Sequence, residues 1–319
     1  MFHLKSTAAL TLFFILSCGS LEEPSSFSFS DGRVYRLHDP GGDRALEPCW
    51  SPDGERIVFS KSYEVGGQVR RSALWIINAD GTEARELISL PGIVYCARWH
   101  PNAEIRKIVF IRRKQILGNH IYSIYSYNLT EVAPEQLYET ELELDCPSYT
   151  RDGEFIVFIG KGLEEGIYKI PASGGEIFPV ENWDGWGTLF AAQCSPTDDL
   201  IAFYQLKNAA VDLYTIYLGG GEPTRLTSFS PPAAGVKLRD TLFNLCWYQD
   251  GSHIIYTHRP GSRSTLDMYV MNKDGNDQVQ LELHENRSFL FMPSMSPDPS
   301  KFAGIYFDLW VVEFNVSLQ

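Results

Sequence analysis

Trp50-Ser51-Pro52-Asp53-Gly54 is followed directly by Glu55-Arg56-Ile57-Val58-Phe59, and this segment is the key to the architecture. Pro fixes φ at the second position of a tight turn, Asp accepts hydrogen bonds from the backbone that follows, and Gly takes positive φ. The run 57–59 is short, branched and apolar, as is typical of a strand buried on both faces. The segment therefore predicts a turn that leads into a buried strand.

The same pattern recurs five more times, so it is an internal repeat. Close copies begin at Tyr149 and Trp247, and weaker copies begin at Trp99, Cys194 and Ser296. The positions equivalent to the turn Asp are 53, 102, 152, 197, 250 and 298, which places the copies 45 to 53 residues apart. A repeat of this length indicates a solenoid or a propeller.

Each copy carries four strand signals. An aromatic-rich strand follows the buried one, at 74–77, 121–124, 167–170, 213–216, 268–271 and 309–312. A second turn, such as Asp80-Gly81, then leads into a short strand, as at 85–87. Together with the strand before the Ser-Pro-Asp-Gly turn, this makes four strands, which describes one propeller blade. We therefore predict an all-β, six-bladed β-propeller of four-stranded antiparallel blades.

The ends of the repeat array predict how the ring closes. The last copy supplies three strands, the third over residues 309–314. An additional strand, Arg33–Leu37, precedes the first copy. We predict that it becomes the outer strand of the sixth blade, because this would join the two ends of the array. The propeller domain would then cover residues 33–316.

The repeat resembles a known family. Trp-Ser-Pro-Asp-Gly-x-x-Ile-x-Phe, followed by Leu74-Trp75 and Asn78-Ala79-Asp80-Gly81, looks like the TolB-type β-propeller repeat. The same repeat occurs in the propellers of prolyl oligopeptidase and dipeptidyl peptidase IV relatives. TolB carries an additional α/β domain and the peptidases carry an α/β-hydrolase domain, and this chain leaves room for neither. The resemblance implies a propeller-only protein related to TolB, and it is specific for fold rather than function.

The N-terminus has the features of an export signal. Lys5 is followed by the apolar run Ala8–Leu16, which is too short to span a membrane. The run ends at Ile15-Leu16-Ser17-Cys18-Gly19, which resembles a bacterial lipobox. We expect a lipoprotein signal peptide over residues 1–17, a lipid on Cys18 and a flexible tether over 18–32. An ordinary secretory signal is the alternative.

The location follows from the same segment. The lipid on Cys18 would be the only attachment to a membrane. By resemblance to Gram-negative sorting, Gly19 directly after the Cys favours the outer membrane, with the protein facing the periplasm. The resemblance therefore predicts a protein of the bacterial cell envelope.

Composition excludes several classes of partner. The chain has 319 residues, with 27 Lys and Arg against 40 Asp and Glu, so its formal charge is −13. This acidity argues against nucleic acid and against docking on anionic lipid, since both need clustered cations. A hydrophobic content of 44% argues against disorder.

No catalytic or cofactor motif is present in the sequence. It contains no Gly-x-Ser-x-Gly, no Gly-x-Gly-x-x-Gly, no P-loop and no His-Glu-x-x-His. The histidines do not match, residue by residue, the axial metal-binding histidines of the related propeller of oligogalacturonate lyase. We therefore predict no catalytic, cofactor-binding or metal-binding residues and expect no cofactor.

The five cysteines after Cys18 share one place in the repeat. They lie three to six residues before the Asp-equivalent position of their copies, at Cys49, Cys96, Cys146, Cys194 and Cys246. This places them on or near the innermost strands, where small buried side chains fit. Disulfides between adjacent inner strands are the alternative in an oxidising compartment. Their positions differ in register, so we do not expect a single ring of thiols.

Acidic residues form one notable cluster. Glu139, Glu141, Glu143 and Asp145 follow a period of two, which predicts one face of an extended segment. A solvated strand edge is the simplest interpretation. A site for a cation or a basic partner near the mouth of the channel is the alternative.

Three segments, 62–72, 112–120 and 231–240, interrupt the repeat, and we expect them to form wide loops. Binding in propellers usually takes place on such loops. Two of these segments should emerge on the same side and form a basic patch for a partner, composed of Arg70, Arg71, Arg112, Arg113 and Lys114.

Three functions are compatible with these features. The leading hypothesis is a monomeric, non-catalytic envelope propeller that binds a protein or peptide through its loops or its axial pocket. The second is a metal-dependent enzyme acting on acidic glycans, similar to oligogalacturonate lyase. The third is a purely structural spacer.

Overall fold

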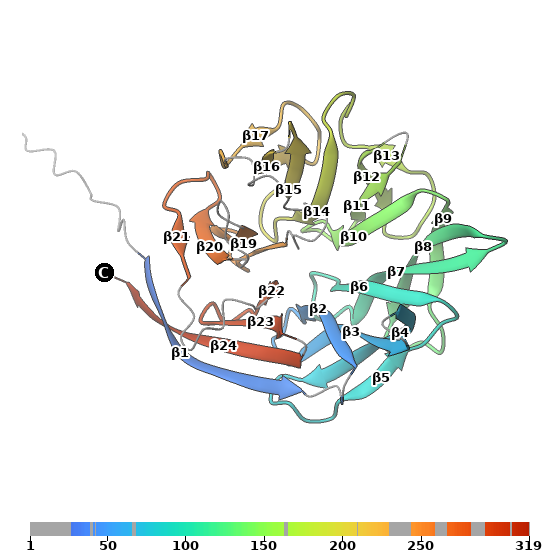
Figure 1. Ribbon diagram of the computed structural model, residues 1–319, viewed down its shortest axis with the longest axis horizontal. Coiled ribbons are helices and arrows are strands. Elements are labelled where there is room, and N and C mark those ends of the chain that lie inside the picture. Colours follow the sequence, from blue (N-terminus) through green and yellow to red (C-terminus); the bar gives the residue numbers. More distant parts are fainter. Residues whose placement is uncertain are drawn as a thin grey trace, which may run out of the picture.

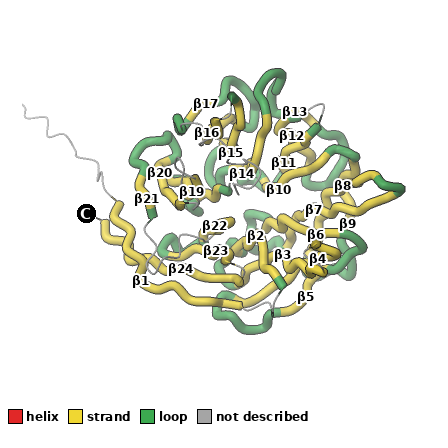
Figure 2. The backbone as a smooth tube through the Cα atoms, in the orientation of Figure 1, coloured by secondary structure: helices red, strands yellow, loops and turns green. Residues whose placement is uncertain are grey.

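The computed structural model describes residues 27–318, apart from 39–40, 42, 66–67, 163–164, 209, 230–243, 259–266, 282–290 and 307. This part of the chain forms six four-stranded antiparallel sheets, which Figures 1 and 2 show arranged as a ring around a central axis. The six-bladed propeller is thus confirmed. The described residues contain no helix long and apolar enough to cross a membrane. The expected signal peptide, Cys18 and the loop at 231–240 lie outside the described residues.

Each blade places its first strand at the axis and its fourth at the periphery. Blades 1 to 3 contain β2 (Arg44–Trp50), β3 (Arg56–Val65), β4 (Gln68–Asn78) and β5 (Arg85–Ile88); β6 (Ile93–Trp99), β7 (Lys107–Ile116), β8 (Asn119–Asn128) and β9 (Glu135–Thr140); and β10 (Glu143–Tyr149), β11 (Phe155–Lys161), β12 (Gly166–Pro171) and β13 (Phe178–Pro179). Blades 4 to 6 contain β14 (Thr188–Cys194), β15 (Leu200–Lys207), β16 (Ala210–Tyr217) and β17 (Thr224–Arg225); β18 (Leu245–Trp247), β19 (His253–His258), β20 (Asp267–Asn272) and β21 (Val279–Gln280); and β22 (Phe291–Met295), β23 (Lys301–Tyr306), β24 (Asp308–Leu318) and β1 (Phe27–His38).

The ring closes as the repeat predicts. β1 is the outer strand of blade 6 and pairs antiparallel with β24, from Phe27 opposite Leu318 to His38 opposite Leu309 (Figure 1). The strand is longer than the expected 33–37. Residues 27–32, which we expected in the tether, form its first half. The first and last strands of the propeller are therefore joined within one sheet.

The repeated turns have the geometry that their residues predict. Ser51 Oγ accepts a hydrogen bond from Arg56 N at 2.9 Å, and Asp53 Oδ1 accepts one from Glu55 N at 3.0 Å. Gly54 has a φ of +72°. The pattern recurs in blade 3, where Thr150 takes the place of the serine. Each such turn connects the first strand of its blade to the second.

The second strand of each blade is buried on both faces, as its sequence predicts. In β3, Ile57, Val58 and Phe59 are all fully buried. Ile57 and Phe59 pack against blade 6, including Val311, whereas Val58 packs against blade 2, including Ile108. Apolar packing between neighbouring blades therefore forms the core of the ring.

The packing of His258 makes stability depend on pH. Its ring stacks on Phe229 with centroids 3.6 Å apart, and burial lowers the pKa of His258 to about 4, opposed by the charge of Asp212. In the unfolded chain, His258 binds a proton near its ordinary pKa of about 6.5, whereas the folded protein does so only near pH 4. The free energy of unfolding is therefore highest above about pH 6.5 and decreases as the pH falls toward 4.

We expect the free energy of unfolding to fall over that interval by about 2 kcal/mol more in the wild type than in His258→Gln, after allowance for the partial solvent access of the ring. Urea denaturation at pH 7 and pH 4 measures both proteins. Equal losses in the two proteins would contradict this assignment.

Candidate functional site

The inner strands carry an irregularity at the same place in the described part of five blades. The pairing of first and second strands shifts there, so that two residues face one. The first residue of each bulge, counted from blade 1 to blade 4 and then blade 6, is Glu47, Cys96, Cys146, Ala191 and Met292. Four of these, all except Cys146, have φ values between +53° and +54°. The bulges place residues of different blades at one level of the axis.

Contacts around the axis link these positions between neighbouring blades. Glu47 N donates to Met292 Sδ at 3.2 Å, and Cys96 N donates to Glu47 Oε2 at 2.6 Å. Cys96 forms a disulfide with Cys146. Ala191 N donates to Asp145 Oδ2 at 3.3 Å. The bulge level is therefore a nearly continuous chain of polar and covalent links.

Glu47 is an acidic side chain at this level. Its Oε2 also accepts a hydrogen bond from Ser60 Oγ at 2.9 Å. Burial raises the pKa of Glu47, and the hydrogen bond from Cys96 N and the charge of Arg98 oppose this. A carboxylate is thus held close to the disulfide.

The cysteines occupy three levels, as their differing registers predict. All five lie on inner strands. Cys96 of blade 2 and Cys146 of blade 3 form a disulfide, which is the alternative that the sequence allowed for adjacent inner strands. Cys49 and Cys246 lie two residues beyond the bulge level and Cys194 three residues beyond it. These three are free thiols, and burial raises the pKa of Cys194 and of Cys246 to about 12. Thiols with such pKa values are poor nucleophiles near neutral pH.

Two cavities lie near the axis, on opposite sides of the bulge level. The hairpin-side cleft, about 280 Å³, lies between blades 1, 2 and 3, and Glu47, Tyr95, Arg113 and Asp145 are among the residues that line it. The turn-side cavity, about 110 Å³, lies where the inner strands run into the Ser-Pro-Asp-Gly turns. Cys49, Arg98, Gln193, Cys246 and Ser294 are among the residues that line it.

The expected loops at 62–72 and 112–120 are largely strands. β3 and β4 form a long hairpin of blade 1 that continues through this region, and β7 and β8 form its counterpart in blade 2 (Figure 1). Val65 pairs with Gln68 at the end of the first hairpin, and Leu117-Gly118 forms the turn of the second. Both hairpins connect the second and third strands of adjacent blades, so they emerge on the same face of the ring. We call this the hairpin face.

The residues of the expected basic patch lie on these two hairpins. Arg71 stacks on the ring of Tyr63 at 4.1 Å, and Arg113 lines the hairpin-side cleft. Arg112 donates to Pro91 O and to Tyr125 Oη. Lys114 forms an ion pair with Glu139 at 3.0 Å, and Arg70 belongs to β4. The structure therefore places all five positions on one pair of hairpins, with Lys114 neutralised.

Apolar side chains lie at or near the tips of the same hairpins. Val69 is 41% exposed, Ile116 44% and Leu117 101%. The other exposed large apolar residues of the described part lie outside these two hairpins: Ile105, Val132, Phe178 and Tyr217. The hairpin face therefore combines cations, aromatic rings and exposed apolar side chains.

The acidic cluster does not form one strand face. Glu139 lies in β9, the chain turns at 141–142, and Glu143 and Asp145 belong to β10. Lys161 contacts both Glu143 and Asp145, at 3.7 and 3.2 Å. The expected extended segment is wrong here because a blade boundary falls inside it.

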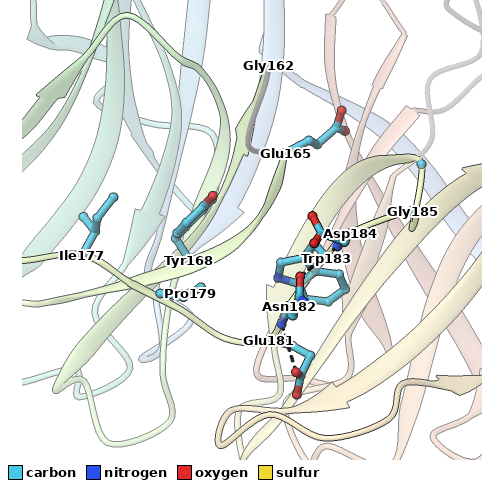
Figure 3. Close-up of a pocket in the computed structure, with 11 residues that line it drawn as sticks. Gly162, Glu165, Tyr168, Ile177, Pro179, Glu181, Asn182, Trp183, Asp184 and Gly185 are labelled. Atoms are coloured by element: carbon cyan, nitrogen blue, oxygen red, sulfur yellow. Dashed lines mark hydrogen bonds between the residues drawn. The ribbon is translucent and has the colours of Figure 1, made fainter.

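A larger groove, about 880 Å³, lies between blades 3 and 4 near the outer strands. Figure 3 shows Tyr168 on one side of it and Trp183 and Asp184 on the other. Trp183 is only 8% exposed, and its Nε1 donates to Ile167 O, so it serves chiefly as core. Glu181 accepts hydrogen bonds from the N–H groups of Asn182 and Gly221. The groove is therefore walled mainly by groups that hold its own loops in place.

Sequence reasoning missed Glu47 and the groove. Glu47 lies six residues before Asp53, and Cys96 and Cys146 lie six residues before their own Asp-equivalent positions. This shared offset could have predicted that the three side chains lie close together near the axis. For the groove, the signal was the connection 181–187, which carries Trp183 and Trp186 between two blades.

Comparison with protein-family models gives no match. Among curated proteins, the uncharacterized peptidase YuxL of Bacillus subtilis is 27% identical over 175 residues, which is 50% of this chain and 23% of that protein. The chain thus spans about a quarter of the length of this relative. This similarity leaves the activity of the present chain open.

Solved structures share the fold at low identity. TolB from Acinetobacter baumannii has a TM-score of 0.58 and 20% identity, covering 88% of this chain and 65% of TolB. A putative TolB from Agrobacterium tumefaciens has a TM-score of 0.60 and 14% identity, covering 91% and 100%. An oligogalacturonate lyase in complex with manganese has a TM-score of 0.57 and 14% identity, covering 91% and 96%. These neighbours are TolB-like propellers and a propeller enzyme, and at such identities they show the fold alone.

Proposed function

We propose that this chain is a non-catalytic binding propeller of the bacterial cell envelope that docks an acidic segment of a partner protein on its hairpin surface. The hairpin surface consists of Val69, Arg71, Arg112, Arg113, Ile116 and Leu117. A lipid on Cys18 would hold the propeller at the membrane. The TolB-like neighbours support a binding propeller. The observation that carries the proposal is the coincidence of exposed apolar tips and cations on two adjacent hairpins.

Apolar exposure supports docking at this place. Val69, Ile116 and Leu117 belong to the hairpins of two neighbouring blades. Burial of apolar side chains drives most protein association, and clustered exposed apolar residues mark such surfaces. Arg and Tyr, which flank the tips, are over-represented among the residues that dominate binding energy. The composition therefore fits a protein interface.

Charge supports an acidic partner segment. Within the described residues, Arg71 and Arg113 form no ion pair, whereas Lys114 is paired with Glu139. The chain as a whole has a formal charge of −13. These two cations, which form no ion pair with the described residues, would orient a partner carboxylate toward this face.

A single substitution at the tip of β7–β8 tests the surface. We expect Leu117→Asp to lower binding of the partner by about tenfold or more, because it places a carboxylate in an apolar contact. A photo-activated cross-linker at position 117, introduced in cells that carry the full-length chain, identifies the partner. Titration of that purified partner against wild type and variant then measures the loss.

Val132 provides the matched control. It is 103% exposed, and it lies in the turn after β8, at the opposite end of that strand. Val132→Asp should bind as the wild type does, and a cross-linker at 132 should capture nothing. Arg71→Ala with Arg113→Ala should weaken binding in a salt-dependent manner, whereas Arg151→Ala, in the turn after β10, should not. Unchanged binding in Leu117→Asp would overturn the proposal.

The lipid anchor is tested separately. Cys18→Ser should release the protein from the membrane fraction and leave its affinity for the purified partner unchanged. Retention of Cys18→Ser in that fraction would reject the anchor and would leave the hairpin surface unaffected.

The alternative, an enzyme for acidic glycans, has no specific support in the described residues. His38 lies in the outer strand β1, His100 follows β6 at a turn, and His253 and His258 lie at the two ends of β19. None of them lines either axial cavity. The groove between blades 3 and 4 is lined by carboxylates and no cation, which would repel an acidic sugar.

A further inference from the structure

Glu47, Cys96 and Cys146 bring three metal-binding groups together at the bulge level. Their ligand atoms, one carboxylate oxygen and two Sγ atoms, all lie within 4.8 Å of one another. We propose that these three side chains bind a divalent metal ion of the zinc class when the Cys96–Cys146 disulfide is reduced, and that the disulfide closes the site when it is oxidised. This proposal does not rest on the docking surface proposed above, although Val69 and Arg113 of that surface line the same cleft as Glu47.

The donor set suits zinc. Thiolates bind Zn²⁺ at about 2.3 Å and carboxylate oxygens at about 2.0–2.2 Å, in tetrahedral sites. Two thiolates at that distance lie about 3.8 Å apart, so the Sγ atoms need to separate only modestly once the S–S bond is broken. Two thiolates and one carboxylate leave a fourth position, which a water molecule in the hairpin-side cleft would occupy.

The backbone holds the donors in place before any metal arrives. Cys96 and Cys146 occupy equivalent bulge positions on the adjacent inner strands β6 and β10. Glu47 is fixed by hydrogen bonds from Cys96 N and Ser60 Oγ, and both reach the same oxygen, Oε2. Oε1 accepts no hydrogen bond from the part of the chain that the structure describes. The hydrogen bonds to Oε2 therefore orient the carboxylate and leave lone pairs of the group for a cation.

The charge of the three donors favours a cation. In the hairpin-side cleft, which Glu47 lines, Lys161 already pairs with Glu143 and Asp145, so these two carboxylates are compensated. Two thiolates and the Glu47 carboxylate supply three negative charges, against the two positive charges of nearby Arg98 and Arg113. A divalent ion thus neutralises charge that would otherwise be confined near the axis.

The two states interconvert by a balanced reaction. A dithiol or phosphine reductant supplies two electrons, and with two protons the disulfide becomes two thiols. A divalent metal then displaces these two protons and forms two metal–sulfur bonds. An oxidant of the disulfide class reverses the process by withdrawing two electrons, which removes the thiolates and releases the metal. The metal and the disulfide are therefore mutually exclusive.

Co²⁺ is the probe for this site, since its thiolate complexes have strong near-ultraviolet charge-transfer absorption. The full-length chain, purified and reduced with a phosphine, should bind one Co²⁺ per chain with this absorption, and Zn²⁺ should displace it. The oxidised protein should give no such band. Glu47→Gln should weaken binding by about tenfold or more, whereas Cys146→Ser should abolish the band.

The other axial thiols provide the matched control. Cys49→Ser with Cys246→Ser should retain the band and the stoichiometry. Loss of the band in this double variant, or its persistence in Cys146→Ser, would overturn the assignment. The assignment would also be overturned if reduced wild type with unchanged circular dichroism gave no thiolate band. That outcome needs no variant, and it would mean that the disulfide is purely structural.

Discussion

A chain that lacks β1, residues 27–38, is expected to lose the cooperative unfolding transition of the propeller. β1 pairs with β24 at ten residue positions, so its removal breaks about ten backbone hydrogen bonds. At about 0.5–1.5 kcal/mol net for each bond, the loss approaches the whole stability of a typical domain, about 5–15 kcal/mol. Tyr35 and Leu37 also leave the apolar core between blades 6 and 1. The deletion would in addition turn β24 into an unprotected sheet edge.

Urea denaturation followed by tryptophan fluorescence and far-ultraviolet circular dichroism measures this effect. Deletion of residues 19–26, which precede β1, is the control and should leave the midpoint unchanged. A chain without 27–38 that unfolds at the wild-type midpoint would show that the ring does not depend on its clasp. The clasp joins the two ends of the array, so intermediate stabilities are expected for shorter deletions from Phe27 onward.

The fold was predictable because each copy of the repeat signals its own strands. Turn residues such as Pro52, Asp53 and Gly54 act through local backbone geometry, and a sequence displays local geometry directly. Closure followed from counting strands at both ends of the array. The start of β1 was misplaced because Ser and Pro around 24–28 favour an extended, solvated chain, whereas pairing with β24 outweighs that preference.

The long hairpins of blades 1 and 2 show a different limit. Residues 62–72 and 112–120 interrupt the repeat, which led to the prediction of loops there. Both segments are largely strands instead, because each hairpin extends beyond the packed ring. Gly118, which has a φ of +93°, marks the turn of the blade 2 hairpin. The interruption of the repeat therefore located these two hairpins correctly but predicted their secondary structure wrongly.

The site at the axis depends on register, which composition does not reveal. Five cysteines on inner strands allow many pairings, and a disulfide requires two of them whose Cα atoms lie close together. Cys96 and Cys146 share an offset of six residues from positions 102 and 152, whereas Cys49 and Cys246 share an offset of four but belong to blades 1 and 5. The shared offset therefore indicates that Cys96 and Cys146 pair. This could not be inferred from the sequence alone, because the position of the bulge in each inner strand was not known.

Reduction of the Cys96–Cys146 disulfide is expected to lower the free energy of unfolding by about 4 kcal/mol, because the bond closes a loop of 50 residues in the unfolded chain. If the reduced thiols bind zinc with Glu47, Zn²⁺ at one hundred times its dissociation constant should restore about 2.7 kcal/mol. Chemical denaturation of the oxidised, reduced, and reduced zinc-loaded protein measures both quantities.

Glu47→Gln separates the two effects within one experiment. The disulfide does not involve Glu47, so reduction should destabilise this variant as much as the wild type, and added zinc should then restore less. Equal restoration in both proteins would place the metal elsewhere, and no loss on reduction would mean that the link constrains the unfolded chain little. In Cys96→Ala with Cys146→Ala, neither reductant nor zinc should change stability, because both effects require these two sulfur atoms at the bulge level.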